Sequence, residues 1–259
     1  MEPVEPLSSQ DVMRHAAQGF RSAGPATMLL MAMLVTAPGL GLSLARLPLA
    51  ALFPLEWITT VYQVAGIGGG VLYVLGAVLA QGALTHATVA ALEGRPTSAA
   101  TSIRVAGRRL HVLAVVCAVT LIGVVLGSTI LIAPGVFLAA ILLPATTIAV
   151  VERTGPIQAL GRSLELTRRH RREMVRVILS MVWLAGIGCC VWGCGVGYVV
   201  VTADLDAPTP LETPTGAFVG ALVNHALRLA LLSLTAACSG AAYFRLRGRP
   251  IGAPPPVVF

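Results

Sequence analysis

The sequence predicts an all-α integral membrane protein with six transmembrane helices, arranged as three helical hairpins that are each preceded by a cytoplasmic amphipathic helix. Its mean hydropathy is +0.84. Only 11% of its residues are charged, against about 25% in soluble domains. The chain also repeats internally, because an apolar stretch runs three times into an arginine-bearing junction with a proline. The junctions are LEGRP at 92–96, VERTGP at 151–156 and RLRGRP at 245–250.

These junctions divide the chain into units. Residues 1–7 are expected to be disordered, 8–249 form a single transmembrane domain, and 250–259 form a proline-rich tail that should stay extended. The repeat units within the domain run over about 8–95, 96–154 and 155–249.

The first unit begins with an amphipathic helix that Ser8 or Ser9 can cap. Its apolar stripe lies opposite a polar stripe, as in helices at a membrane surface. The two stripes are Val12, Ala16 and Phe20, and Arg14, Gln18 and Arg21. Spans over about 26–47 and 57–93 follow. The second is longer than a membrane requires, so it must tilt, protrude or break. A break is expected at the glycines Gly66, Gly68, Gly69 and Gly70.

The second unit opens at Pro96-Thr97-Ser98 and places Arg104 and Arg108 opposite an apolar face. That face comprises Ala99, Ile103, Ala106 and Leu110. Spans over about 111–132 and 136–151 follow, separated by a tight turn at Ala133-Pro134-Gly135. The second of these spans is short and contains Pro144.

The third unit opens at Gly155-Pro156, and its amphipathic helix leads to spans over about 174–201 and 216–244. The helix has an apolar side and a charged side. These are Ile157, Leu160 and Leu164, and Arg162, Glu165, Arg169, Arg172 and Arg176.

The arginines set the expected orientation. All 18 basic residues are arginines, and all except Arg46 and Arg228 lie in the N-terminal segment, the junctions or the C-terminal tail. By the positive-inside rule, these segments and both termini are cytoplasmic, in a multi-pass protein of the bacterial cell (inner) membrane. Six crossings satisfy the rule. Were 136–151 alone re-entrant, the number of crossings would be odd and one arginine cluster would lie outside.

One stretch resembles a known family. The sequence LLPATTIAVVERTGPIQALGRSLELTRRHRREMVRVIL at 142–179 is similar to the glycerophosphoryl diester phosphodiesterase membrane domain family. The matching positions are Pro144, Glu152, Gly155, Ala159, Arg162, Ser163, Leu166 and Thr167. The ending AAYFRLRGRP resembles that family's close through Tyr243 and Arg245. No aromatic follows Ser163, however, and His170 stands where small residues are usual. The resemblance implies a multispan membrane part without an assigned activity.

Catalytic chemistry is not expected. A phosphodiesterase needs carboxylates and histidines converging on a metal, and the chain lacks such a cluster, so we expect no enzyme, catalytic residue, metal or cofactor. Cys189, Cys190 and Cys194 match no zinc spacing. The glycines around them favour close helix packing instead.

Two functions of different classes remain open. In the first, a scaffold, anchor or accessory subunit contacts anionic lipid headgroups or an acidic protein partner through arginines, because each is worth about 1 kcal/mol near anionic lipid. These are Arg104, Arg108, Arg109, Arg162, Arg168, Arg169, Arg171, Arg172 and Arg176. Nucleic acid is not an expected partner, since aromatic residues do not interleave with these charges.

The second function is that of a small-molecule or lipid transporter with a polar path involving spans two and six. Ionisable groups inside a membrane are functional candidates. The candidates are Gln81, His86, Asn224, His225 and Arg228. Hydrogen bonds to neighbouring helices explain Gln81 and His86 equally well, and His225 and Arg228 can pair with Glu56 or Asp204 near the outer interface.

Overall fold

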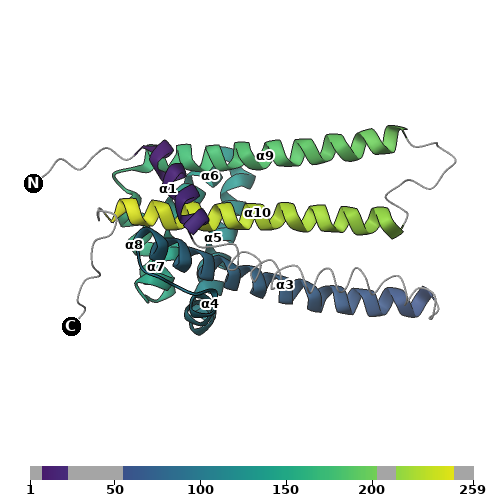
Figure 1. The fold of residues 1–259 in the computed structure, drawn as a ribbon, viewed down its shortest axis with the longest axis horizontal. Helices are drawn as coiled ribbons and strands as arrows, with labels where there is room; N and C mark the ends of the chain where they lie inside the picture. Colours follow the sequence, from purple (N-terminus) through teal and green to yellow (C-terminus); the bar gives the residue numbers. More distant parts are fainter. Residues whose placement is uncertain (1–7, 23–54, 203–213, 248–259) are drawn as a thin grey trace, which may run out of the picture. The chain divides into compact units, whose positions relative to one another are not determined.

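The computed structural model describes residues 8–22, 55–202 and 214–247, which are helical without any strand (Figure 1). This confirms the all-α class. The helices are α1 (Ser9–Ser22), α3 (Leu55–Leu92), α4 (Ala99–Arg108), α5 (Leu110–Ile130), α6 (Ile132–Leu142), α7 (Ala145–Val151), α8 (Pro156–Thr167), α9 (Arg171–Thr202) and α10 (Pro214–Leu246). The expected span over 26–47, the N-terminal residues 1–7 and the tail at 250–259 lie outside the described residues.

Five segments of this part of the chain are long and apolar enough to cross a membrane, which is typical of a membrane protein. Each overlaps one of the expected second to sixth spans, although the bounds differ by up to about a dozen residues. The segments are Gly68–Leu92, Leu110–Ile130, Ile132–Val151, Arg171–Cys190 and Leu222–Leu246.

The start signals of the amphipathic helices are confirmed. The Ser8 hydroxyl accepts a hydrogen bond from the Gln10 amide at 3.3 Å at the start of α1. Ser98 is the N-cap of α4 and accepts from the Thr101 amide at 3.2 Å. Pro156 occupies the first position of α8, where its missing N–H leaves no hydrogen bond unmade.

The break expected at the glycines of 66–70 is wrong, because α3 is helical without interruption over its 38 residues. Glycine lowers helix stability by about 1 kcal/mol relative to alanine. Breaking the helix would leave backbone groups unpaired, and in apolar surroundings each unpaired group costs several kcal/mol. The intact hydrogen-bond ladder therefore prevails over glycine's weak helix propensity.

The tight turn expected at Ala133-Pro134-Gly135 is also wrong, because these residues lie in the first turns of α6. The chain reverses at Leu131, the single extended residue between α5 and α6. Proline fits the first turn of a helix, where amides have no intrahelical partner. The expected span over 136–151 is interrupted as well, since α6 ends at Leu142 and α7 begins at Ala145.

The chain divides into two compact units. Unit 1 comprises 1–30, 78–182 and 232–259, and unit 2 comprises 31–77 and 183–231. In unit 2, a Cβ at Gly188 of α9 would lie 3.1 Å from a methyl group of Leu227 in α10. The glycine thus permits the close helix contact that its surroundings predicted.

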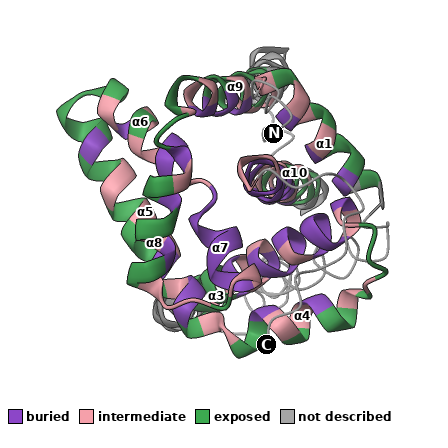
Figure 2. Cartoon of the chain, turned by 90° about the vertical axis from the view of Figure 1, so that its left-hand side faces the viewer, coloured by how far each residue is buried: buried purple, intermediate pink, exposed green. Residues whose placement is uncertain are grey.

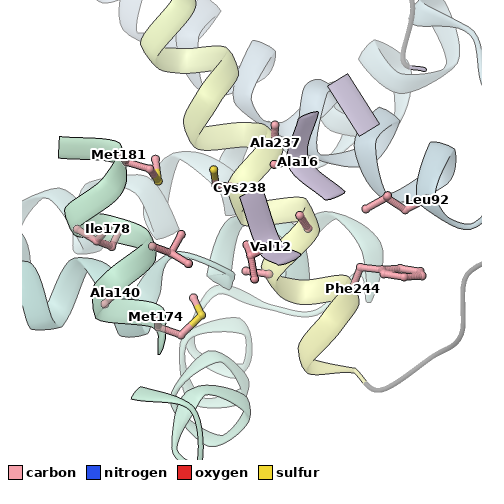
Figure 3. Close-up of a cluster of buried hydrophobic side chains, with 13 residues drawn as sticks. Val12, Ala16, Leu92, Ala140, Met174, Ile178, Met181, Ala237, Cys238 and Phe244 are labelled. Carbon is pink, nitrogen blue, oxygen red and sulfur yellow. The ribbon is translucent and has the colours of Figure 1, made fainter. Parts of the chain in front are cut away.

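The core of unit 1 surrounds the C-terminal part of α10. Every residue of α10 over 236–244 is buried, and Figure 2, which looks along α10, shows it in the middle of the surrounding helices. Figure 3 shows the apolar cluster to which α1, α3, α6, α9 and α10 contribute, including Val12, Met174 and Phe244. Apart from Tyr243 and Phe244, the buried run of α10 consists of Ala, Cys, Ser and Gly, which allows neighbouring helices to approach closely.

The C-terminus of α3 is a Schellman motif, in which the residue after the helix adopts a left-handed conformation. Gly94 has φ +69°. Its amide donates to the Ala91 carbonyl at 3.1 Å, and the Arg95 amide donates to the Ala90 carbonyl at 2.8 Å. A glycine is favoured here because a Cβ is strained at positive φ.

We expect Gly94→Ala to lower the free energy of unfolding by about 1 kcal/mol, measured as a lower thermal midpoint of the detergent-solubilised protein. No atom lies within 4 Å of the added Cβ, so the loss reports backbone conformation alone. Gly161→Ala, which is equally open but in a regular helix, should not destabilise. Equal midpoints for Gly94→Ala and the parent would contradict the prediction.

Candidate functional site

The helix α8 follows the apolar segment Ile132–Val151 and precedes the apolar α9. Its buried face consists of the small residues Ala159, Ser163 and Thr167, all fully buried. They recur every four residues and therefore lie on one side of the helix. Ala159, Ser163 and Thr167 are positions of the family resemblance, whereas two further matching positions in α8, Arg162 and Leu166, are exposed and half-buried, respectively.

Two serine hydroxyls donate hydrogen bonds to backbone carbonyls next to the helix interruption at Pro144. The Ser163 hydroxyl donates to the Ile141 carbonyl at 2.6 Å, and the Ser239 hydroxyl of α10 donates to the Leu143 carbonyl at 2.7 Å. Proline lacks the N–H that would continue the helix. Hydroxyl groups can satisfy backbone carbonyls at a helix break inside a membrane. One of these hydrogen bonds therefore joins α8 to the break, and the other joins α10 to it.

A small network of hydroxyls surrounds Ser239. Thr147 lies 2.7 Å and Thr146 3.3 Å from the Ser239 oxygen, and all three residues are buried. The Ser239 proton goes to the Leu143 carbonyl, and a hydroxyl can also accept, so the Ser239 oxygen can accept from both threonines. This network was not predicted, although the small-residue run AACSGAA at 236–242 was a usable signal for a tightly packed α10.

The two stretches that resemble the family are joined by a hydrogen bond. The Tyr243 hydroxyl donates to a Glu152 carboxylate oxygen at 2.9 Å, and Tyr243 is 1% exposed. Arg153, directly after Glu152, has φ +55°. Gly94, directly after Glu93, has the same left-handed conformation at the preceding junction. At both junctions, the apolar helix is therefore followed by a residue in the left-handed conformation.

The arginines after and within α8 point away from this packing. Arg162, Arg168, Arg169, Arg171, Arg172 and Arg176 are exposed, as are Arg104 and Arg108, whereas Arg109 is half-buried. Within the described residues, two of them pair with carboxylates: Arg162 with Glu165 at 2.8 Å and Arg176 with Glu173. The hydrogen bond to Glu165 raises the pKa of Arg162, so its charge persists.

Arg168, Arg169 and Arg172 pair with no carboxylate among the described residues. The Arg171 guanidinium lies 5.6 Å from the centre of the Phe137 ring in α6, within the range of a cation–π contact. The cluster therefore presents positive charge that the described part of the chain does not neutralise.

The predicted apolar side of α8 is not its buried side. Ile157 is 84% and Leu164 45% exposed, and Leu160 is half-buried. The helix thus has a packed face of small residues, an open apolar face and a charged face. An open apolar face beside arginines is typical of helices that lie in a membrane interface.

The residues of the predicted polar path are divided between the two units. In unit 1, Thr235 donates to Gln81 at 3.2 Å, and the His86 ring nitrogen lies 3.1 Å from the Ser102 hydroxyl. In unit 2, the Arg228 guanidinium lies 5.4 Å from the Tyr73 ring centre. His225 is buried and Asn224 half-buried. The side chains of Glu56 and Asp204 lie outside the described residues.

Cysteines and metal-binding groups give no further site. Cys189 and Cys190 are free and exposed, while the Cys194 side chain lies outside the description. Across the described residues, no group of three His, Cys, Asp or Glu side chains could hold a metal ion. No family model matches this chain, and neither a curated protein nor a solved structure does.

Proposed function

We propose that this chain is a non-enzymatic membrane protein, acting as a scaffold, anchor or accessory subunit, that binds anionic lipid headgroups through the arginines of α8 and the start of α9. This proposal depends on the guanidinium groups of Arg168, Arg169 and Arg172, which are exposed and pair with no carboxylate in the described part of the chain. A guanidinium group can form bidentate hydrogen bonds with two phosphate oxygens, which suits a phospholipid headgroup. The open apolar side of α8 supports a bilayer rather than an acidic protein as the partner.

The arginine asymmetry supports a location in the cell (inner) membrane with both termini cytoplasmic. Membership of the glycerophosphoryl diester phosphodiesterase membrane domain family is also proposed. It is supported by the Tyr243–Glu152 hydrogen bond, which links the two matching stretches. Transport receives less support, because Gln81 and His86 each have a hydrogen-bond partner on another helix.

The test replaces Arg168, Arg169, Arg171 and Arg172 by glutamine in the full chain. Each arginine contributes about 1 kcal/mol near anionic lipid, so the loss of four can weaken binding by up to about 4 kcal/mol. We expect the preference for phosphatidylglycerol over phosphatidylcholine to fall by between about tenfold and about a thousandfold. The preference is measured by titrating the detergent-solubilised protein with fluorescent lipid in mixed micelles. Added salt should weaken binding by the parent more than binding by the variant.

The matched control is the double variant Arg162→Gln and Arg176→Gln. Both arginines are paired with carboxylates, so their removal should change the preference less per charge. An unchanged preference in the quadruple variant would refute the proposed function. Equal losses per charge in the two variants would show dependence on net charge alone.

A further inference from the structure

The hairpin of α5 and α6 has a large apolar surface that no described residue covers. Leu121, Ile122, Val125 and Leu126 of α5 are exposed. At the apex, Ile130 is 78% and Ile132 76% exposed. By length and hydropathy α5 could cross a membrane, so this surface must meet acyl chains somewhere. Two contacts of α6 limit how deeply the apex of the hairpin can enter the bilayer.

The first contact joins α6 to the arginine cluster. The Arg171 guanidinium lies 5.6 Å from the Phe137 ring centre, and Phe137 is five residues from Ile132. At about 1.5 Å per residue and a helix radius of about 5–6 Å with side chains, the apex lies less than about 20 Å from that guanidinium. The hydrocarbon core is about 30 Å thick. An apex on the far side of the membrane would draw Arg171 deep into hydrocarbon, at a cost of several kcal/mol.

The second contact joins α6 to α8. The Ser163 hydroxyl donates to the Ile141 carbonyl at 2.6 Å, next to the exposed Arg162. Ile141 is nine residues from Ile132, about 14 Å along the helix. That distance is about half of the hydrocarbon core. If the arginines of α8 lie among headgroups, the apex therefore reaches no further than the middle of the bilayer.

The arrangement of the helices in unit 1 agrees with this limit. Figure 2 looks along α10, whereas α5 and α6 are seen from the side in that view. The hairpin thus runs across the direction of α10. A close backbone approach holds it together, because a Cβ on Gly127 would lie 3.0 Å from the Gly135 backbone.

We propose that the α5–α6 hairpin enters the bilayer from the arginine-rich side, stays within that leaflet and returns, so that its exposed apolar residues contact the acyl chains of one leaflet only. The inference rests on the proposed function in one respect, the placement of the arginines among headgroups. Because both helices return together, Arg104–Arg109 and Arg153–Arg176 remain on one side. The third and fourth of the six expected crossings are thereby replaced by a re-entrant hairpin.

The test is the variant Thr129→Cys, since Thr129 is exposed near the apex. Arg169→Cys reports the arginine-rich side, and Thr209→Cys reports the loop expected on the opposite side. Each full-length variant is treated with a membrane-impermeant maleimide in intact cells and in inverted vesicles, and the parent chain gives the background of the native cysteines. We expect no labelling of position 129 from the side that labels position 209.

A nitroxide attached at position 129 measures depth independently of thiol reactivity. We expect at least fivefold higher accessibility to oxygen than to a water-soluble nickel chelate, relative to a nitroxide at position 209, as for a site within hydrocarbon. Labelling of positions 129 and 209 from the same side, or nickel accessibility at 129 equal to that at 209, would overturn the inference. The proposed function fails separately, through unchanged lipid preference in the arginine variant.

Discussion

Gly135→Ala should lower the free energy of unfolding by about 3 kcal/mol, the upper part of the range for overpacking. The added Cβ would lie 1.9 Å from the Ser128 Oγ, 2.8 Å from its amide nitrogen and 2.9 Å from its Cβ. The hydroxyl can rotate away, but the nitrogen and Cβ belong to α5 and can move only if the two helices separate. The measurement is the thermal midpoint and the detergent-denaturation midpoint of the purified protein.

Gly123→Ala is the matched control, because Gly123 is also in α5 and nothing lies within 4 Å of its added Cβ. It should be neutral or stabilising by up to about 1 kcal/mol through helix propensity. Adding Ser128→Gly to Gly135→Ala removes the Ser128 Cβ and should recover part of the loss. If both alanine variants unfolded at the same midpoint, the close approach of α5 and α6 would be refuted.

Gly240→Leu should have an effect of similar or larger size, at least about 3 kcal/mol. A Cβ on Gly240 of α10 would lie 3.1 Å from the Thr88 Cγ2 and 3.5 Å from the Thr85 carbonyl oxygen. A Cβ on Gly19 of α1 would lie 2.6 Å from the same Thr88 methyl group. Thr88 is therefore enclosed by two glycines, and a leucine on either side forces α3 away from its neighbour.

A double-mutant cycle isolates this contact. Gly240→Ala should destabilise less when Thr88→Ala has removed the blocking methyl group, giving an interaction energy of about 1 kcal/mol. Gly161→Leu, on the open side of α8 where no atom lies within 4 Å, controls for the leucine side chain itself. Additive effects of Gly240→Ala and Thr88→Ala would show that the glycine does not make room for Thr88.

Much of the secondary structure was predictable because it depends on neighbouring residues. The cap at Ser8 and the proline at the start of α8 are local signals, and both were confirmed. The two errors at glycine-rich and Pro-Gly segments have a common cause. Sequence reasoning counts weak helix formers, whereas an apolar environment penalises unpaired backbone groups more strongly than it penalises glycine.

The candidate site was predictable only in part. The arginines were identified from their spacing, and most of them are exposed. The side on which α8 packs was not, because hydrophobicity pointed to Ile157 and Leu164 whereas the helix packs through Ala159 and Ser163. In water apolar residues turn inward, but next to a bilayer large apolar residues can face lipid while small residues allow helices to pack.

The sequence by itself determined the class of this protein: its apolar segments, its repeated junctions and the gathering of arginine into those junctions. These properties follow from composition and spacing along one chain. Only the tertiary structure decided that Ser239 donates to the Leu143 carbonyl beside Pro144, that Tyr243 binds Glu152, and that Arg171 lies over the Phe137 ring of α6. Such contacts join residues up to about a hundred positions apart, and they are set by how closely helix surfaces fit, which no local pattern specifies.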